Sequence, residues 1–391
     1  MENLQIKIIS CEEKLENAEL DALSGAAGVQ HQIKYLQTLS KNLDNNFKGY
    51  FVVAQGLDEI VGWTFIFIDS RFSFDGVLSG TMEKIYKVFP AKFKTAFISS
   101  PVAEYNVIHI KDKHKSRESD IVDIMIKNVL KFLKDESVKL VIIKDHIAPY
   151  ASEYLHKKFI HLHFMPGTFV DLEDMHSYGD NCSCFDDYLM GLRKKWRANI
   201  RNKINRRKND LTIEVTPAVS LSVEQRKRCH ELYFQTREKQ RLKHECLSSN
   251  YFCACGKELG EHCKMLIAKK GEHIIGFAQL LENEDNIINV RMGMDYRYSR
   301  EYNLYYHLLY ENISYCILMK KKRLYTSQTC YRPKLEVGAK LLPLHTYLYF
   351  NNPILQQVFG RIIASNCRRY SELIAAKNPT EVLAKYNLSA Y

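Results

Sequence analysis

Apolar and polar positions alternate in two stretches of the chain that resemble each other. Residues 50–69 read YFVVAQGLDEIVGWTFIFID, a run of β-branched and aromatic residues, a polar turn and a second such run. Residues 263–283 repeat that order, with a turn at Lys270-Gly271 and the same step of two apolar residues, a glycine and an aromatic residue. Each stretch therefore predicts a β-hairpin.

The elements expected after each hairpin also match. The first is followed by an apolar stretch ending at Ile110, a polar loop, an amphipathic helix at residues 119–135 and the strand LVIIKD. The second is followed by INVRMGMD, a loop, a helix at residues 303–321 and the strand RLYTSQT. This order resembles a GNAT-type acyltransferase half-barrel. We therefore expect an α/β (α+β) fold of tandem GNAT-like domains, each a mixed, mostly antiparallel sheet flanked by helices.

Turn-rich and charged segments suggest where these domains end. Residues 1–176 are the expected N-terminal GNAT-like domain, with residues 164–172 as its last strand. After the connector SYGDNCSC, residues 177–352 form the second domain, which opens with a basic helix capped by Asp186 or Asp187. Residues 353–391 are expected to form a C-terminal helical tail.

The basic helix is the most unusual stretch in charge. Nine Lys or Arg residues stand among the sixteen positions 193–208, without a carboxylate, in a chain whose net charge is +11. Like charges four residues apart repel each other on a helix, so a plain solvated face usually mixes signs. The pattern favours contact with an anion, with a solvated face as the alternative.

An apolar stripe on the same helix predicts that it docks on a core rather than extending as a free arm. Trp196 occupies a position of this stripe, so we expect it in the same core. Duplex DNA is not an expected partner, because no helix-turn-helix or zinc finger accompanies the helix. RNA backbone, lipid headgroups, pyrophosphates and an acidic carrier protein stay open. The stripe consists of Leu189, Leu192, Trp196, Ile200 and Ile204.

Composition narrows the class of protein. The acidic N-terminus lacks the pattern of a secretory signal, and the most apolar runs are far shorter than the roughly 20 residues of a membrane span. Eleven scattered cysteines indicate a reducing compartment, so we expect a cytoplasmic protein. The clusters HEC, CAC and HC between residues 244 and 263 contain zinc-ligand residue types but no C-x-x-C pair, and we expect no metal site.

Three segments together resemble the FemABX-like and related GNAT-fold acyltransferases, described broadly as peptidoglycan-biosynthesis-like. They are FDDYLMGLRKKWRANIRNKINRRKNDLTIEV, YFQTREKQRLKHECLSSNYFCAC and SQTCYRPKLEVGAKLLPLHTYLYF, and the similarity covers roughly residues 185–353. The matching positions are Tyr233, Thr236, Leu247, Tyr251-Phe252, Gln328, Lys334, Gly338, Pro343 and Tyr347.

The resemblance implies transfer of an acyl or aminoacyl group to an amine of a small-molecule or precursor acceptor. The donor would be acyl-CoA, an acyl carrier protein or an aminoacyl-tRNA, with no tightly bound cofactor. The loops before the two long helices, KDKHKSRES and DYRYSREYN, lack the glycines with which GNAT enzymes cradle the CoA pyrophosphate at a helix N-terminus. A standard CoA site is therefore in doubt.

Several residues carry the expected chemistry. His307 stands where relatives tend to carry a glutamate, and Glu311 one turn later could orient it as a general base, unless the pair only marks a solvent edge. Lys334 could hold a phosphate or steady an oxyanion, unless it is a solvated loop cation. Arg297 with Arg300 could bind a donor phosphate. Expected substrate or phosphate contacts are Arg193, Lys194, Arg197, Arg201, Arg291, Gln328, Tyr331 and Arg332.

A second class of function stays open. A GNAT-like fold that has lost its chemistry could serve as a non-catalytic protein that binds RNA or a membrane surface, and peripheral membrane contact is compatible with either class. Loss of transfer on substituting His307 or Lys334 would distinguish the two classes.

Overall fold

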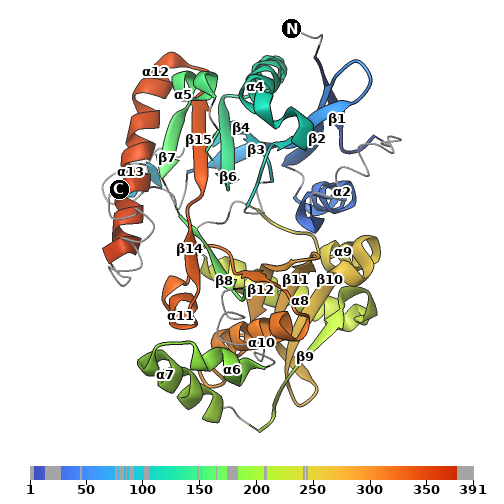
Figure 1. Cartoon of the computed structure of the whole chain (residues 1–391), viewed down its shortest axis with the longest axis vertical. Helices are drawn as coiled ribbons and strands as arrows, with labels where there is room; N and C mark the ends of the chain where they lie inside the picture. The colour runs from blue at the N-terminus through green and yellow to red at the C-terminus, as the bar shows by residue number, and fades with distance from the viewer. Residues whose placement is uncertain are drawn as a thin grey trace. The chain divides into compact units, whose positions relative to one another are not determined.

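The computed structural model describes most of the chain (Figure 1). The described residues are 4–13, 28–44, 46–74, 78, 83–84, 86–87, 92–100, 105–147, 149–150, 152–163, 165–173, 184–206, 209–240, 243 and 245–376. The chain divides into two compact units. Unit 1 comprises Met1–Met165, Arg241–Ser248 and Pro343–Tyr391, and unit 2 comprises Pro166–Gln240 and Ser249–Leu342.

Unit 1 is built on a mixed sheet with the order β1-β2-β3-β4-β6-β15-β7, to which β5 adds beside β3. Its strands are β1 (Gln5–Ser10), β2 (Phe47–Gln55), β3 (Ile60–Ser73), β4 (Lys92–Ile98), β5 (His109–Ile110), β6 (Leu140–His146), β7 (Ile160–His163) and β15 (His345–Phe350). Its helices are α2 (Ile33–Asn42), α4 (Glu118–Asp135), α5 (Glu153–Lys158), α12 (Pro353–Gln357) and α13 (Phe359–Ala376).

Unit 2 is built on a second mixed sheet with the order β14-β8-β13-β12-β11-β10-β9. Its strands are β8 (Gly167–Asp171), β9 (Leu211–Pro217), β10 (Cys263–Lys270), β11 (His273–Glu282), β12 (Asn286–Met294), β13 (Arg323–Tyr325) and β14 (Lys340–Leu342). Its helices are α6 (Phe185–Met190), α7 (Lys194–Asn205), α8 (Val223–Lys239), α9 (Tyr251–Leu259), α10 (Leu304–Leu318) and α11 (Tyr331–Glu336).

Both hairpins expected from the sequence are present. β2 and β3 pair antiparallel, as do β10 and β11, whose turn contains Gly271 in the left-handed region at φ 54°. In each unit the hairpin leads to a further strand, a long helix that crosses over, and a parallel partner strand. The expected α+β fold with two mixed sheets is confirmed.

The closing strands are exchanged between the units. We expected residues 164–172 to supply the last strand of the first domain, and this expectation is wrong. β8 instead pairs antiparallel with β13 and β14 in unit 2. In return, β15 lies between β6 and β7 in unit 1 (Figure 1), with Leu348 opposite Ile142 and Ile160. Strand pairing uses backbone N–H and C=O groups that nearly every residue carries, so the side-chain pattern does not choose the sheet.

This exchange sets the limits of the compact units. The divisions at Met165/Pro166 and Leu342/Pro343 fall earlier than the expected residues 176 and 352. Each division separates two strands that are consecutive in the chain, β7 from β8 and β14 from β15. The C-terminal tail expected after residue 353 forms α12, with Pro353 in its first turn, and α13.

The basic stretch forms two helices rather than one. α6 ends before Gly191, and α7 begins after Arg193. The cap of α6 is Cys184, not Asp186 or Asp187, and its backbone N–H donates to Asp187 Oδ2 at 3.1 Å. The Asp187 carboxylate thus lies within the helix and accepts a hydrogen bond from the backbone N–H of the N-cap residue.

The predicted apolar stripe does dock on the core of unit 2. Leu189 and Ile200 are fully buried, and Leu192 and Ile204 pack against the same cluster. Trp196, which we expected in the core, is only half-buried, and the Arg193 guanidinium lies 5.1 Å from its ring centroid. Among the described residues, no helix is long and apolar enough to cross a membrane.

Gly293 on β12 allows α8 to pack directly on the strand. A Cβ at this position would lie 2.3 Å from Phe277 Cε1 and 2.8 Å from the backbone of both Leu232 and Tyr233. We expect Gly293→Ala to lower the free energy of unfolding by about 1–3 kcal/mol, because the helix backbone cannot yield as a flexible side chain would. Urea unfolding followed by circular dichroism measures the change.

The matched control is Gly276→Ala on β11, where the nearest atom to a new Cβ is the terminal Leu308 Cδ1 at 3.3 Å. This variant is expected to change stability by less than about 1 kcal/mol, since a leucine rotamer can adjust. Equal losses in the two variants would contradict the close approach of α8.

Candidate functional site

The parallel strands of unit 2 stop pairing after three residues. Asn286–Ile288 of β12 lie opposite Arg323–Tyr325 of β13, and the pairing ends there. Two residues after Ile288, Val290 forms a bulge, because Gln279 of β11 pairs with Arg291 while the next residue of β11 pairs with Asn289. We call this place, between residues 289–294 and 326–330, the unit 2 fork. At the fork, the backbone of β12 and the chain that follows β13 no longer pair with each other.

The chain after β13 is held in an unusual conformation at the fork. Ser327, Thr329 and Cys330 all have positive φ, at 65°, 66° and 47°. Such conformations cost of order 1–3 kcal/mol each for residues other than glycine and persist only where surrounding contacts impose them. Here the Thr326 N–H donates to Thr168 O of β8 at 2.8 Å, and Ser327 Oγ donates to Asn289 O of β12 at 3.2 Å.

Lys334 on α11 supplies further contacts to this loop. Its side chain is 3% exposed, and Nζ donates to the carbonyl oxygens of Ser327 at 2.9 Å and Gln328 at 3.0 Å. The alternative of a solvated loop cation is therefore wrong. The structure brings Lys334 and Gln328 together, although Gln328 contributes its backbone rather than its side chain to this contact.

The two residues near Lys334 that we expected at the site have different surroundings. Tyr331 is buried, and its hydroxyl donates to Pro166 O at 2.7 Å, so it anchors α11. Arg332 is 85% exposed, and its Nε donates to Glu336 Oε1 at 3.3 Å. A surface pair of this kind contributes little to stability.

His307 and Glu311 both lie on α10. His307 is 2% exposed and packs in a T-shaped arrangement with Tyr310, at 6.1 Å between ring centroids. Glu311 is half-buried. His307 is thus enclosed by unit 2, while Glu311 keeps partial access to solvent.

Arg291 follows the bulge on β12. It is half-buried, and its Nη1 donates to the carbonyl of the preceding Val290. The hydrogen bond holds the guanidinium against the backbone of β12 at the fork. A phosphate bound by Arg291 would therefore lie beside this strand.

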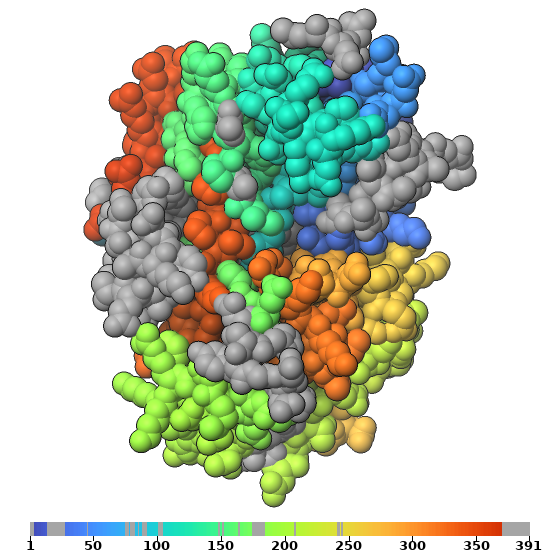
Figure 2. Space-filling model, viewed as in Figure 1, coloured from blue at the N-terminus to red at the C-terminus, as the bar shows by residue number. Residues whose placement is uncertain are grey.

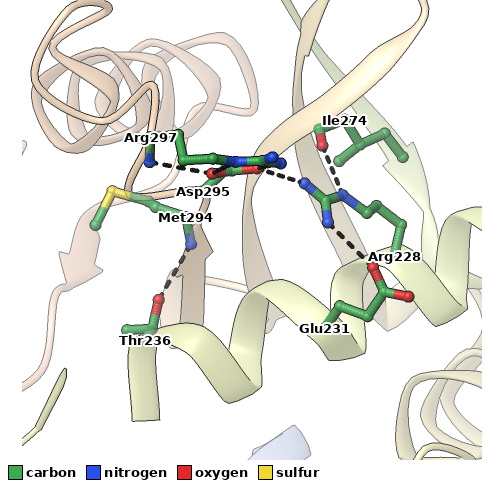
Figure 3. A network of polar contacts seen from close by, with 7 residues as sticks. All are labelled: Arg228, Glu231, Thr236, Ile274, Met294, Asp295 and Arg297. Carbon is green, nitrogen blue, oxygen red and sulfur yellow. Dashed lines mark hydrogen bonds and ion pairs between the residues drawn. The ribbon is translucent and has the colours of Figure 1, made fainter. Parts of the chain in front are cut away.

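The loop between β12 and α10 closes around a carboxylate (Figure 3). Asp295, which is fully buried, accepts from Arg297 Nη2 at 2.7 Å, from the Arg297 backbone N–H at 3.1 Å, and from Arg228 Nη2 at 2.7 Å. The hydrogen bonds from Arg297 are the main reason that the pKa of Asp295 falls to about 2. Figure 3 shows both guanidinium groups converging on this carboxylate.

This network changes the expected role of the loop. Arg297 is tied to Asp295, and the Tyr298 and Leu304 N–H groups donate within the loop, to Asp295 O and Ser299 O. Backbone N–H groups that would cradle a pyrophosphate in a glycine-rich loop thus already have partners, and a carboxylate anion lies among them. Arg300 remains exposed on the surface.

The cations of α7 divide into two groups. Lys194, Lys195 and Arg201 are exposed, and no carboxylate of the described residues forms an ion pair with them. In Figure 2 the yellow-green atoms of α6 and α7 form an open surface of unit 2. Lys203 turns inward, with Nζ 4.5 Å from the centroid of the Tyr306 ring. Arg197 is half-buried, and its Nη1 donates to Met190 O at 3.1 Å.

In the part of the chain that the structure describes, no three side chains of metal-binding type are grouped, near the HEC, CAC and HC segments or elsewhere. Cys255 and Cys263 are fully buried, and burial raises the pKa of both thiols, which disfavours the thiolate that a metal requires. His244 and Cys182 lie outside the described residues.

Unit 1 has a corresponding fork, and its own chain closes it. Residues Thr95–Ile98 of β4 pair with Leu140–Ile143 of β6. Beyond them, Asn106 forms a parallel bridge with His146. The Asn106 N–H donates to Asp145 O at 3.0 Å, and its carbonyl accepts from Ile147 N. A separate segment thus bridges the end of β6 in unit 1, beyond the ladder that β6 forms with β4.

A buried chain of hydrogen bonds lies beside this closed fork. Ser99 Oγ is 2.8 Å from His146 Nε2, and His146 Nδ1 is 2.5 Å from the Tyr150 hydroxyl, which accepts from Ile108 N. The His146 ring therefore lies between the hydroxyl groups of Ser99 and Tyr150, and it links β6 to the ends of neighbouring segments of unit 1.

The buried histidines of unit 1 should make it sensitive to acid. Burial lowers the pKa of His109 to about 2 and that of His146 to about 3. In the unfolded chain both titrate near 6.5, so below that pH the unfolded state binds protons that the folded state does not. We expect the free energy of unfolding to fall by up to about 1.4 kcal/mol per pH unit for each histidine as pH drops from 6.5.

Urea midpoints between pH 7.5 and 5 measure this effect, because carboxylates contribute little in that window. His109→Gln should reduce the change in the free energy of unfolding per pH unit by about the contribution of one histidine. A midpoint that stays constant over the window would contradict the burial of neutral imidazoles.

Comparison with known proteins agrees with this architecture. The chain matches the model of the FemAB-like family, described as peptidoglycan biosynthesis/recognition, over residues 13–380. Its structure is similar to a crystal structure of FemX, with a TM-score of 0.55 at 10% identity over 88% of this chain and 98% of that one. No curated protein sequence matches the chain.

Two further solved structures show the same fold. A tandem GNAT protein from the clavulanic acid biosynthesis pathway, solved without AcCoA, has a TM-score of 0.51 at 9% identity, over 89% of this chain and 99% of that one. L-PGS from Bacillus licheniformis has a TM-score of 0.51 at 11% identity, over 90% and 98%. With two GNAT-like sheets, their parallel forks and a family match over most of its length, the chain belongs to the FemAB-like family and has its acyl- and aminoacyltransferase-like fold.

Proposed function

We propose that the protein transfers an acyl or aminoacyl group from a thioester or an aminoacyl-tRNA to an amine, and that the reaction takes place at the unit 2 fork. The observation that carries the proposal is the buried Lys334, whose ammonium group holds the strained loop 326–330 against the end of β13. A fixed cation at a site shielded from water stabilises developing negative charge more than it would in solution.

The chemistry needs a base as well as a cation. An alkylamine with a pKa near 10.4 is mostly protonated at neutral pH, so forming the reactive free amine costs roughly 4.6 kcal/mol. The amine nitrogen attacks the carbonyl carbon, a tetrahedral oxyanion forms, and the C–S or C–O bond breaks as the nitrogen loses its proton. We assign the proton to His307, oriented by Glu311, and the oxyanion to the field of Lys334.

The charges around the fork favour a donor that carries many phosphates. Lys194 and Arg201, with Arg193 and Arg197 beside them, offer cations on α7, whereas Asp295 places a carboxylate where a CoA pyrophosphate would be cradled. Aminoacyl-tRNA therefore fits better than acyl-CoA, and an acyl carrier protein presents only one phosphate to such a surface. Gln328, Arg291 and Arg332 are the proposed further contacts to the substrates.

The second candidate is a protein that binds RNA or a membrane surface without catalysis. The exposed face of α7 favours RNA within that class, because cations and the amides of Asn202 and Asn205 dominate it, although the exposed Met190 of α6 lies beside Arg201. Binding of RNA with no turnover of any donor would establish this candidate instead.

A test of the reaction compares two histidines of unit 2. We expect His307→Gln to lower the transfer rate by about 10²–10⁴-fold and to remove the acidic limb of the pH-rate profile. His262→Gln, on an exposed histidine that contacts Glu282 O, should leave the rate unchanged. The assay offers a pool of aminoacyl-tRNAs and of acyl-CoAs with an amine fraction of a cell extract and detects products by mass spectrometry. Equal rates in both variants would remove His307 from the mechanism.

A further inference from the structure

The cationic helix α7 is fastened to α11 through one carboxylate. The Glu336 side chain is 14% exposed and accepts from Asn199 Nδ2 at 3.0 Å, while Lys203 Nζ lies at 3.9 Å. Arg332 Nε approaches the same carboxylate from α11 itself, at 3.3 Å. Two of these three donors therefore come from α7.

Other contacts place α6 and α7 against the end of α11. The Tyr188 hydroxyl donates to Val337 O, the residue that follows the helix. Gly338 has a φ of 84°, and a Cβ there would lie 2.7 Å from Leu192 Cδ2. The polar contacts of Glu336 thus lie within a packed junction of α6, α7 and α11, where a lost hydrogen bond cannot easily be replaced by water.

The opposite end of α11 carries the fork loop. α11 is only six residues long, so Glu336 and Lys334 move together as parts of one short helix. Its N-cap is Cys330, the last residue of the loop with positive φ. A shift of α7 would therefore reach the two carbonyl groups that Lys334 holds.

We propose that Glu336 is a positioning residue that couples the cationic face of α7 to the conformation of the loop 326–330. Asn199 is the link, because its Nδ2 donates to Glu336 and its Oδ1 accepts from Lys203 Nζ at 2.8 Å. A shift of α7 caused by a phosphate polymer on its exposed cations would therefore reach Glu336. This inference rests on the proposed function, in which α7 meets the donor and Lys334 serves the fork. Occupancy of α7 would then set the loop before the acyl group reaches it.

The exposed thiol of Cys330 reports on the loop. Its side chain lies beside Tyr305 of α10, so a displaced loop should change its reaction with iodoacetamide. The rate at this residue is read from its peptide by mass spectrometry. Asn199→Asp places two carboxylates together and is expected to raise the rate by about tenfold. Glu336→Gln keeps an acceptor for Asn199 Nδ2 but removes the charge that strengthens this hydrogen bond, and is expected to raise the rate by about threefold.

The double variant N199D/E336Q provides the decisive comparison. It restores the pair with donor and acceptor exchanged, because the glutamine amide can donate to the new aspartate. The alkylation rate of Cys330 should return to within about twofold of the parent protein. An unchanged rate in both single variants, or a double variant as fast as the singles, would overturn the coupling.

Glu282→Gln is the matched control. Glu282 is also a half-buried carboxylate of unit 2, 12% exposed, which accepts from Tyr315 and pairs with Lys321 at 3.1 Å. The Glu282→Gln variant should lower the urea midpoint without changing the alkylation rate of Cys330. An equal rise in this variant would reduce the effect of Glu336 to general loss of stability. None of these measurements uses a donor or an acceptor, so failure of the proposed transfer and failure of the coupling are separate results.

Discussion

Replacing Lys334 with methionine is expected to lower the rate of transfer by about 10²–10³-fold, the loss typical for removal of one group that stabilises an oxyanion. The variant removes both contacts of the ammonium group with Ser327 and Gln328. It also leaves two carbonyl groups without their partner in a loop whose φ angles are already unfavourable. We therefore expect a simultaneous loss in stability of about 2–4 kcal/mol.

Single-turnover transfer measures the first effect, and urea unfolding the second. Lys340→Met is the matched control, because Lys340 is 30% exposed and pairs with Asp171 at 3.0 Å on the neighbouring strand. It should change stability by less than about 1 kcal/mol. If Lys334→Met does not fold, Lys334→Arg keeps the charge with a different reach and should fold but transfer slowly. Transfer within threefold of the parent rate in either variant would remove Lys334 from the reaction.

Neutralising the exposed face of α7 is expected to weaken binding of tRNA on the order of 50-fold at 0.15 M salt. The triple variant replaces Lys194, Lys195 and Arg201 by glutamine. The estimate follows if each cation neutralises one phosphate of a single-stranded backbone, with a slope of about 0.7 in log K against log salt per contact. The slope itself should therefore fall by about 2. Fluorescence anisotropy with mixed tRNA over a range of salt concentrations measures both quantities.

The control for net charge replaces Lys227, Lys257 and Lys320, which are exposed elsewhere in unit 2. It removes the same charge from separate places and should change the affinity by only a few fold, since long-range fields are screened at this salt concentration. Equal losses in the two triple variants would mean that α7 has no special role. A salt slope near zero in the parent protein would exclude a phosphate backbone as its ligand.

The two forks differ in the segment that follows the paired strands. In unit 1, Asn106 forms an isolated parallel bridge with His146, whose ring lies 2.8 Å from Ser99 Oγ. In unit 2, the ladder stops at Tyr325, and a loop held by Lys334 takes its place. The fork of unit 2 is therefore the one where we propose that the reaction takes place.

The sequence by itself determined the elements and their order. Alternation of side chains predicted both hairpins, and the helical spacing predicted α4 and α10, because these patterns reflect which side of a local element faces a core. It also located the cations of α7 and the docked stripe of Leu189 and Ile200, which the structure confirms. The lack of glycine before α10 pointed to the loop that the structure shows closing around Asp295.

Only the tertiary structure decided which strands share a sheet and what the site residues touch. β8 and β15 exchange units because backbone groups pair without regard to side-chain pattern. The positive φ of Ser327, Thr329 and Cys330 has no sequence signal, since none of them is glycine. Lys334, Asp295 and Glu336 owe their roles to partners brought close by folding. Charge and periodicity are properties of the chain, whereas burial and partnership are properties of the packed protein.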